Sequence, residues 1–345
     1  MSAEHERFLV TGAGGCIGSA LAHRLAKSDA QHLILLDHSE HELYEIDLAL
    51  DDADGGVPHI AIVGDICDAA LLEEVLEEHR PTTIYHAAAF KHVPMMEKNP
   101  LAAIRNNVFG TLALAQAAHK YKTAQLVMVS TDKAVNPRSV MGVSKRIAEL
   151  ILLRWNGAST RMKAVRLGNV LGSRGSVVPL FMKQIARGGP VTVTHPDVRR
   201  YFVSLSEAVD IICTVADQQN GGIFVAQAGK PVKIADLARQ LIHDVGFDPA
   251  KEIPIDFTEL RAGEKTEEEM LCANESAEPT GDEQIRRVQC PEIDTAQLDA
   301  DIAELQESVE RRDLSASLEM LVRIVPEYEP SELLLSQIAR SCAPK

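Results

Sequence analysis

The chain has 345 residues, of which 46% are hydrophobic and 25% are charged, and its formal net charge at pH 7 is −15. This length supports a large core without disulfide or metal staples, and the composition is that of a globular protein. The negative charge disfavours binding to nucleic acid or to an anionic membrane surface, so an anionic ligand would need a local basic pocket.

The cysteines form no C-x-x-C pair and no cysteine–histidine cluster with zinc spacing, so we predict no metal site. The first ten residues lack an apolar signal segment, and no run of roughly 18 apolar residues occurs. We therefore expect reduced thiols, a cytoplasmic location and no membrane span in this chain. The cysteines are Cys16, Cys67, Cys213, Cys272, Cys290 and Cys342.

Short apolar runs alternate with amphipathic stretches through the first half of the chain. This alternation is typical of βαβ units, in which a parallel sheet is covered by helices on both faces. The fold class predicted is α/β, a Rossmann-type doubly wound parallel sheet with a smaller α/β C-terminal substrate subdomain. The predicted strands are residues 8–11, 33–37, 60–64, 83–87, 126–130 and 164–167, and the predicted helices are residues 17–27, 69–79, 101–121 and 143–155.

The pattern becomes less regular after about residue 172. We predict a dinucleotide-binding domain over residues 1–172, with a returning segment near 203–228, and a substrate-binding subdomain with C-terminal helices over 173–345. The acidic segment EEEMLCANESAEPTGDE, residues 267–283, predicts a solvated loop. The other predicted elements are helices at 206–217 and 233–245, a strand at 223–226 and a terminal helical segment at 296–325.

A glycine motif follows the first predicted strand. Gly12, Gly15 and Gly18 are spaced G-x-x-G-x-x-G, which allows a pyrophosphate to approach the start of the next helix. A plain tight turn is the alternative interpretation of the glycines alone. Asp37 ends the second strand 19 residues after Gly18, close to the ~20 expected for a carboxylate that binds an adenosine ribose. Because this carboxylate would repel a 2′-phosphate, we predict NAD rather than NADP.

The cofactor contacts extend to the ends of the next strands. Asp65 follows the third strand and could reach the adenine, although an ordinary strand-end aspartate is the alternative. The full set of predicted cofactor contacts is Gly12, Gly15, Cys16, Ile17, Gly18, Asp37, Asp65, Ile66, Ala87, Ala88, Lys91 and Lys145.

The segment VSTDKAVNPRSVMGVSKR, residues 129–146, carries the candidate catalytic groups. Asp132 and Lys133 end the fifth strand, at the edge where parallel sheets bind ligands. A simple strand-end ion pair is the alternative for these two residues. Met141 and Lys145 are four residues apart and therefore lie on one face of the predicted helix.

Many motifs in order resemble the polysaccharide-biosynthesis branch of the extended short-chain dehydrogenase/reductase superfamily. They include TGAGGCIGS, LLDHSEHELYEID, HAAAFKHVPMMEKNP, STDKAVNP, RLGNVLGSRGSVVPLF and LRAGEK. Over residues 7–330 the chain is similar to the UDP-N-acetylglucosamine 4,6-dehydratases. Long members of that family carry an N-terminal membrane region, so we expect either a short form or the catalytic portion of a longer protein.

The resemblance implies oxidation of the sugar at C4, loss of water across C5 and C6, and return of the hydride to C6. The product is a 4-keto-6-deoxy sugar nucleotide, and NAD ends unchanged. In the matching motif Asp132 is the acid for the 6-hydroxyl and Lys133 is the base for the C5 proton. Both would act in their neutral forms, which burial favours and mutual ion pairing opposes.

Ordinary members of the superfamily have a tyrosine at the position of Met141, and a thioether cannot accept the proton of the 4-hydroxyl. Thr131, Asp132 or a water must then accept it, and we rank Asp132 or a water relay first. Lys145 can still bind the nicotinamide ribose. Dehydratases that retain the C5 configuration resemble this chain in having Met here, so the resemblance implies retention.

The resemblance also implies contacts with the UDP group, for which arginine forks are suited. The partner expected is UDP-N-acetylglucosamine or a close UDP-amino sugar, and a homo-oligomer is expected. The alternatives are a 5-epimerising dehydratase or nucleotide-sugar epimerase, and a noncatalytic dinucleotide-binding regulator. The predicted substrate contacts are Lys91, His92, Asn169, Arg174, Ser176, Arg261 and Glu264.

Overall fold

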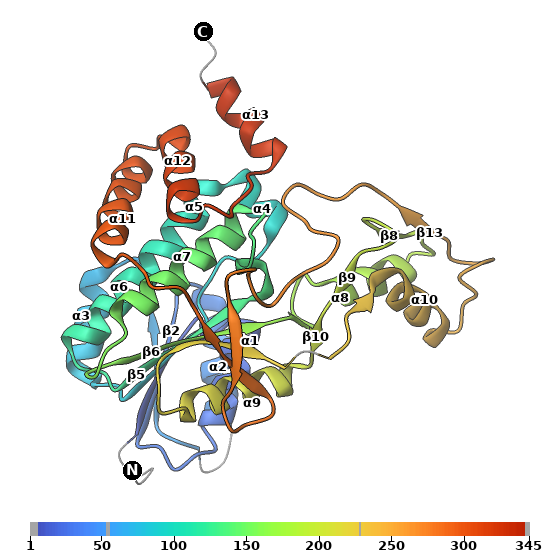
Figure 1. The fold of residues 1–345 in the computed structure, drawn as a ribbon. Helices are drawn as coiled ribbons and strands as arrows, with labels where there is room; N and C mark the ends of the chain where they lie inside the picture. The colour runs from blue at the N-terminus through green and yellow to red at the C-terminus, as the bar shows by residue number, and fades with distance from the viewer. Residues whose placement is uncertain (1–5, 53–55, 228, 342–345) are drawn as a thin grey trace.

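The computed structural model describes residues 6–52, 56–227 and 229–341, so Cys342 lies outside the described residues. A nine-stranded sheet with the order β14-β15-β11-β6-β5-β4-β1-β2-β3 forms the centre of the larger lobe (Figure 1). The strands from β3 to β11 run parallel, while β15 and β14 are antiparallel additions. This confirms the predicted fold class and all six of the first predicted strands. The strands are β1 (Arg7–Thr11), β2 (His32–Asp37), β3 (His59–Val63), β4 (Thr83–His86), β5 (Gln125–Thr131), β6 (Arg161–Leu167), β11 (Gly222–Ala226), β14 (Ser276–Pro279) and β15 (Ile285–Gln289).

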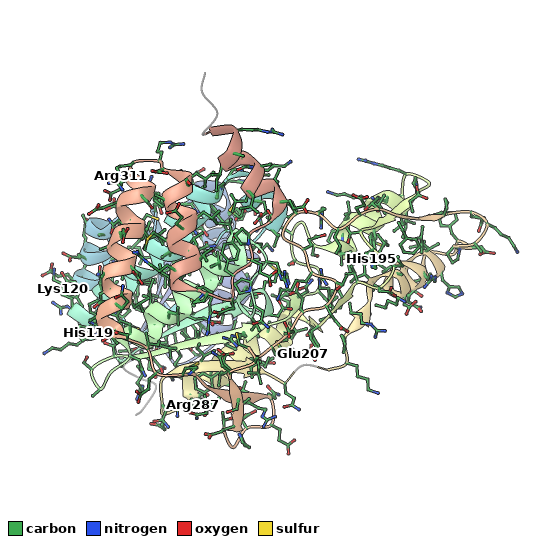
Figure 2. All side chains as sticks on the ribbon, turned by 45° about the horizontal axis from the view of Figure 1, so that its top comes forward. His119, Lys120, His195, Glu207, Arg287 and Arg311 are labelled. Carbon is green, nitrogen blue, oxygen red and sulfur yellow. The ribbon has the colours of Figure 1, made fainter. Side chains whose placement is uncertain are left out.

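Helices cover both faces of this sheet, and alternate residues of one strand point into different cores. Leu9 packs with α3, α6 and α7, whereas Phe8 and Val10 pack with α1, α2 and α9. Ser204 and Glu207 form a capping box at the start of α9 (Glu207 is labelled in Figure 2). The helices are α1 (Cys16–Leu25), α2 (Glu40–Asp51) and α9 (Leu205–Asp217) on one face, and α3 (Ala69–His79), α6 (Gly110–Lys120) and α7 (Val140–Trp155) on the other.

The predicted helix at 101–121 is interrupted. It consists of α5 (Pro100–Ile104), a π-helix (Arg105–Phe109) and α6. Asn107 of the π-helix bonds both backbone groups of Phe90 and donates to Ser144 Oγ at 2.9 Å. The π-helix therefore joins the loop after β4 to α7, and such bulges are frequent at functional sites.

A smaller lobe lies beside the sheet (Figure 1). Its own apolar core is formed by α8 (Val177–Ile185), β8 (Val191–Val193), α10 (Ile234–Asp244) and β13 (Ile255–Phe257). Three two-stranded pairs connect its segments, and the remaining short strands are β7 (Asn169–Val170), β9 (Arg199–Arg200), β10 (Phe202–Val203) and β12 (Val232–Lys233).

The C-terminal helices return to the larger lobe. The predicted segment 296–325 consists of two helices, and the second of them packs on α5 and α7. Across the residues that the structure describes, every helix is too short or too polar to traverse a bilayer. The remaining helices are α4 (Val93–Lys98), α11 (Thr295–Glu310), α12 (Leu314–Ile324) and α13 (Glu332–Ser341).

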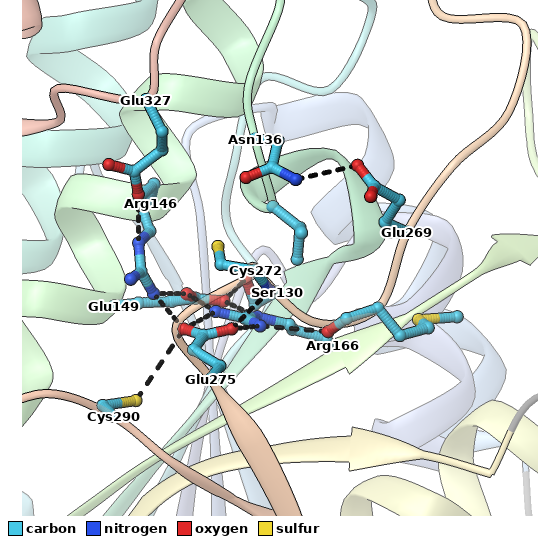
Figure 3. A network of polar contacts seen from close by, with 12 residues as sticks. Ser130, Asn136, Arg146, Glu149, Arg166, Glu269, Cys272, Glu275, Cys290 and Glu327 are labelled. Atoms are coloured by element: carbon cyan, nitrogen blue, oxygen red, sulfur yellow. Dashed lines mark hydrogen bonds and ion pairs between the residues drawn. The ribbon is translucent and has the colours of Figure 1, made fainter.

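The prediction of a solvated loop at 267–283 is wrong, because this segment contains β14 and a buried carboxylate. Arg166 donates to both oxygens of Glu275, at 2.7 and 3.0 Å, and to both oxygens of Glu149, at 2.9 and 2.8 Å (Figure 3). Arg146 also pairs with both carboxylates, and Ser130 donates to Glu149. The acidic composition of residues 267–283 indicated solvent exposure. Glu275 is instead buried, because two buried arginines from other elements neutralise its charge.

The two arginines also set the protonation of Glu275. Burial by itself raises the pKa of a carboxyl group, but hydrogen bonds and charge from Arg166 and the charge of Arg146 lower the pKa of Glu275 to about 2. The network is therefore ionised at neutral pH. We call Arg146, Glu149, Arg166 and Glu275 the buried charge network.

Removing one member of the buried charge network should be strongly destabilising. We expect Arg166→Ala to lower the free energy of unfolding by about 3–5 kcal/mol, because two carboxylates lose a buried partner. Arg239 makes a comparable but exposed pair with Asp236, so Arg239→Ala should cost at most about 1 kcal/mol. Urea denaturation of both variants measures the difference, and equal losses would contradict the assignment.

The network should also make stability depend on acid pH. The pKa of Glu275 is depressed in the folded state, so its stabilisation is present above its unfolded value of 4.5 and is lost toward about pH 2. The difference in unfolding free energy between the wild type and Glu275→Gln should therefore shrink between about pH 5 and about pH 2.5. Urea midpoints across this range test it; a constant difference would contradict it.

Candidate active site

The loop between β1 and α1 is closely packed, and its glycines are required. Gly12 has a φ of +70°, and a Cβ there would lie 2.6 Å from the backbone nitrogen of Ala88. A Cβ on Gly18 would lie 1.9 Å from the carbonyl oxygen of Gly12. Gly15 precedes the first turn of α1 without a side-chain cap, so the N–H groups of that turn are available to an anion.

A cavity with an empty volume of about 550 Å³ lies at the carboxyl ends of β1 to β4. This is the edge at which parallel sheets bind dinucleotides. Seven of the predicted cofactor residues line it, and Lys91, Lys145 and the α1 residues Cys16, Ile17 and Gly18 lie outside its lining. The lining residues are Gly12, Gly15, Leu36, Asp37, His38, Glu42, Gly64, Asp65, Ile66, Ala87, Ala88, Ala89, Phe90 and Asn106.

Asp37 lines the cavity and also accepts hydrogen bonds from the backbone of two loops. Its Oδ2 accepts a hydrogen bond from the backbone nitrogen of Gly14 and its Oδ1 accepts one from Ser39, both at 2.9 Å. The carboxylate is thus held in place before any ligand binds. Cradling glycines, open N–H groups and a fixed carboxylate at a strand end fit an NAD-type dinucleotide.

The candidate catalytic residues form a hydrogen-bonded cluster at the end of β5. Thr131 Oγ1 donates to Asp132 Oδ1 at 2.9 Å, and Lys133 Nζ donates to the same oxygen at 2.9 Å. Lys133 Nζ also donates to Asn169 Oδ1 at 2.9 Å. Asp132 is fully buried, and its Oδ2 accepts no hydrogen bond from the residues that the structure describes. That oxygen is free to serve a ligand, because buried acceptors are rarely left unpaired without a reason.

The structure does not favour the neutral amine expected for Lys133. Burial alone lowers the pKa of a lysine, but the negative charges of Asp132 and Glu268 outweigh it and raise the pKa of Lys133 overall. Lys133 is therefore an ammonium at rest, paired with Asp132. Glu268 was missed because it belongs to the acidic segment predicted to be solvated, and only the fold brings it to Lys133.

Met141 and Lys145 occupy one buried face of α7. Met141 is only 3% exposed and packs in the main apolar core. Burial lowers the pKa of Lys145 to about 8, although Glu149 opposes this shift. Two contacts fix the start of α7, since Ser139 Oγ accepts from Gly142 and Glu97 accepts from the backbone nitrogen of Val140 at 2.7 Å.

The structure divides the predicted substrate residues between two places. Asn169 contacts Lys133, and Ser176 Oγ is buried without a hydrogen-bond partner in the described ranges. Arg174 instead pairs with Glu42 and donates to the carbonyl oxygen of Gly14 at 2.8 Å, which places it at the cofactor cavity.

The other predicted substrate residues lie on loops near these groups. His92 packs against Gly175, where an added Cβ would lie 2.5 Å from His92 Cε1, and the neighbouring Lys91 is exposed. Arg261 Nε donates to Glu264 at 2.9 Å on the loop after β13. The same loop is tied to the catalytic segment, because Lys265 Nζ donates to the carbonyl oxygen of Val135 at 2.6 Å.

Comparison with known proteins agrees with this geometry. Residues 8–290 match the family described as polysaccharide biosynthesis protein. The chain belongs to this family. Its fold is that of the extended short-chain dehydrogenase/reductases, as the motifs predicted.

Two relatives are similar in sequence to most of this chain. The chain is 47% identical over 275 residues to the capsular polysaccharide biosynthesis protein CapD of Staphylococcus aureus, covering 79% of this chain and 46% of CapD. It is 46% identical over 272 residues to the probable polysaccharide biosynthesis protein EpsC of Bacillus subtilis, covering 77% of this chain and 45% of EpsC. The chain therefore spans less than half the length of these relatives.

Solved structures give the same fold. Pen from Bacillus thuringiensis superposes with a TM-score of 0.75 at 25% identity, covering 86% of this chain and 90% of Pen. The dTDP-glucose 4,6-dehydratase DesIV from Streptomyces venezuelae, with NAD bound, gives a TM-score of 0.66 at 24% identity, covering 76% of this chain and 88% of DesIV. At this identity the second likeness shows the fold alone.

The tight glycine loop predicts a sharp effect of one methyl group. Gly18→Ala should weaken NAD binding by at least about tenfold, because the added Cβ would displace the loop. A loss of ~1.4 kcal/mol in binding free energy gives this factor. Gly157→Ala is the matched control, since a Cβ there has no neighbour within 4 Å. Titration calorimetry with NAD compares the two; unchanged affinity in Gly18→Ala would show that the loop does not bind the dinucleotide.

Proposed function

We propose that the protein is an NAD-dependent hydro-lyase that catalyses 4,6-dehydration of UDP-N-acetylglucosamine, or a close UDP-amino sugar, with retention at C5. The observation that carries this proposal is the hydrogen-bonded pair of buried Asp132 and partly exposed Lys133 after β5, at the same edge of the sheet as the cavity. Elimination of water needs an acid and a base on neighbouring carbons, and the pair supplies both types of group. The family relationship to polysaccharide biosynthesis proteins supports a sugar nucleotide as the substrate.

A bound NAD would supply the hydride acceptor for oxidation at C4 and, in its reduced form, the hydride for C6. The protein residues that would hold it are Gly12, Gly15 and Asp37, with Lys145 at the nicotinamide ribose. A fixed carboxylate at the adenosine ribose favours NAD over NADP, since a 2′-phosphate would be repelled. The low pKa of Lys145 leaves this amine available for hydrogen bonding.

The protons would be handled by the cluster at β5. Asp132 Oδ2, which no described residue hydrogen-bonds, would accept the proton of the 4-hydroxyl directly or through a water, and would then protonate the departing 6-hydroxyl. Lys133 would take the proton from C5, exchange it with solvent and deliver a proton to the same face. Met141 has no acid–base function in this scheme and fills the apolar face of α7.

The substrate contacts remain proposals. Asn169, Ser176, Lys91 and His92 would face the sugar and its diphosphate, and Arg261 with Glu264 would bind the uridine diphosphate after their own ion pair opens. Arg174 lies at the cofactor cavity in this conformation, so its role in binding UDP would require it to leave Glu42.

Two alternatives are weaker. A further relative, the UDP-glucose 4-epimerase of Rickettsia rickettsii, is 32% identical to this chain over 283 residues, covering 78% of each chain. A nucleotide-sugar epimerase or a 5-epimerising dehydratase is the second candidate for this reason, but neither explains Met141. A noncatalytic regulator would have no use for a buried Asp132 oxygen that no described residue satisfies, beside a lysine.

A homo-oligomer in the cytoplasm remains the expectation for assembly and location. The helices α5 and α7 are packed against α12 of the same chain. A subunit contact through helices that flank the sheet would therefore include C-terminal helices.

The proposed reaction is tested by incubating the protein with NAD and UDP-N-acetylglucosamine in deuterated water and recording proton NMR spectra. We expect a 4-keto-6-deoxy product that carries deuterium at C5 in the original configuration. An inverted C5 would support the epimerising alternative, and no turnover would support the regulator.

Lys133→Ala should lower the dehydration rate by about 10²–10⁴-fold, the usual contribution of a positioned acid or base. Lys251→Ala, which removes an 81% exposed lysine, is the control and should leave the rate unchanged. Undiminished dehydration in Lys133→Ala would refute the assigned base.

A further inference from the structure

Lys133 contacts a second carboxylate that the reaction as described does not use. Glu268 Oε1 lies 3.5 Å from Lys133 Nζ, and Glu268 is buried although it belongs to the acidic segment after β13. The other oxygen, Oε2, accepts no hydrogen bond from any residue within the described ranges. Glu268 therefore has an oxygen that could carry a proton.

Several backbone contacts fix Glu268 in this place. Arg200 donates to the carbonyl oxygens of Lys265 at 2.8 Å and Thr266 at 3.2 Å, and its Nε lies 3.6 Å from Glu268 Oε1. Two residues further along, Arg166 of the buried charge network donates to the carbonyl oxygen of Met270 at 3.0 Å. Both sides of Glu268 are thus held by buried arginines from other elements.

The charged groups around Lys133 come from three segments. Asp132 lies next to it in the short 3-10 turn (Asp132–Ala134) that follows β5, Arg200 is at β9, and Glu268 and Lys265 lie on the loop that follows β13. Lys265 Nζ is 3.9 Å from Glu268 Oε2. Arg200 and Lys265 therefore both place a positive charge beside Glu268.

The resting charges create a difficulty for the proposed function, on which this inference rests. At rest Lys133 is an ammonium that is paired with Asp132. Once the proton of the 4-hydroxyl has moved to Asp132, Asp132 is a neutral carboxylic acid and Lys133 is still an ammonium. Lys133 can no longer pass its proton to Asp132, and it cannot accept the proton from C5 until it loses its own.

We propose that Glu268 accepts the proton of Lys133 during the elimination and returns it afterwards. The N–H bond of the ammonium breaks and an O–H bond forms on Glu268, which leaves a neutral amine, a neutral Asp132 and a neutral Glu268. The C5 proton then moves to Lys133, and Asp132 gives its proton to the departing 6-hydroxyl, which leaves as water.

The remaining steps restore the starting state. Lys133 returns a proton to C5 when C6 is reduced, and Glu268 then returns its proton to Lys133. The 4-hydroxyl proton has left with the water and C5 has regained a proton. Lys133 is again an ammonium, and Asp132 and Glu268 have each given up the proton that they accepted. Because Glu268 acts through Lys133 and not on the sugar, it is a positioning residue for the base.

The experiment compares Glu268→Gln, Glu268→Asp and Glu267→Gln. Glutamine matches glutamate in shape but cannot accept the proton, whereas aspartate keeps an ionisable carboxyl group. Glu267 is an exposed neighbour whose removal changes the net charge equally. Two readouts are taken: the titration of the Lys133 side chain by NMR with labelled lysine, and kcat and KM for UDP-N-acetylglucosamine with deuterium incorporation at C5.

We expect Glu268→Gln to lower the pKa of Lys133 and to reduce kcat about 100-fold with little change in KM, a typical effect of a positioned proton-transfer group. Glu268→Asp should recover part of kcat, and Glu267→Gln should match the wild type in both readouts. A wild-type kcat in Glu268→Gln would overturn the proposal even if the pKa of Lys133 changes.

The titration also separates this proposal from the proposed function. If the wild-type protein does not dehydrate the sugar nucleotide, the proposed function fails, and the titration of Lys133 still reports on Glu268. An unchanged titration in Glu268→Gln would then overturn the coupling of the two residues, and a lowered pKa of Lys133 would support it.

Discussion

The buried charge network of Arg146, Glu149, Arg166 and Glu275 connects the parts of the molecule that form the candidate site. Arg166 lies on β6, Glu149 and Arg146 lie on α7, and Glu275 precedes the added strand β14 (Figure 3). Ser130, which donates to Glu149, is the residue before Thr131. One network therefore fixes the end of β5, the helix that carries Met141 and Lys145, and the segment that carries Glu268. Four buried charges of opposite sign tolerate burial only as a complete set, which gives them a single arrangement.

This arrangement explains how an acidic protein can hold the groups needed for an anionic ligand. The net charge of −15 repels anions at a distance, but Arg200, Lys133 and Lys265 are gathered beside the candidate catalytic segment, where they are largely shielded from solvent. Electrostatic interactions are stronger in such surroundings than at the surface. The same closeness makes the protonation states of Asp132, Lys133 and Glu268 depend on one another, so no single residue can be treated as the acid or base alone.

Local sequence signals were sufficient where one element decides the outcome. Apolar runs predicted the parallel strands because both faces of each strand are buried, and the glycine spacing predicted the loop because a Cβ at Gly12 or Gly18 has no room. Asp37, Asp65, Ile66, Ala87 and Ala88, which the sequence predicts as cofactor contacts, all line the cavity, since strand ends in a parallel sheet share one edge. The strand-end pair Asp132 and Lys133 was recognised in the same way.

The sequence by itself therefore determined the fold class, the dinucleotide loop and the identity of the pair at the end of β5. Only the tertiary structure decided which carboxylates are buried, where Arg174 lies and what surrounds Lys133. The reason is that strand periodicity and glycine spacing act over a few residues, whereas burial of a charge depends on partners that are distant in the chain. Glu275 lies 109 residues from Arg166 in the chain. Glu268 contacts Lys133 although the residues of the smaller lobe lie between them in the sequence. In an acidic stretch such as 267–283, composition indicates solvent, and only the packing of the arginines against it shows otherwise.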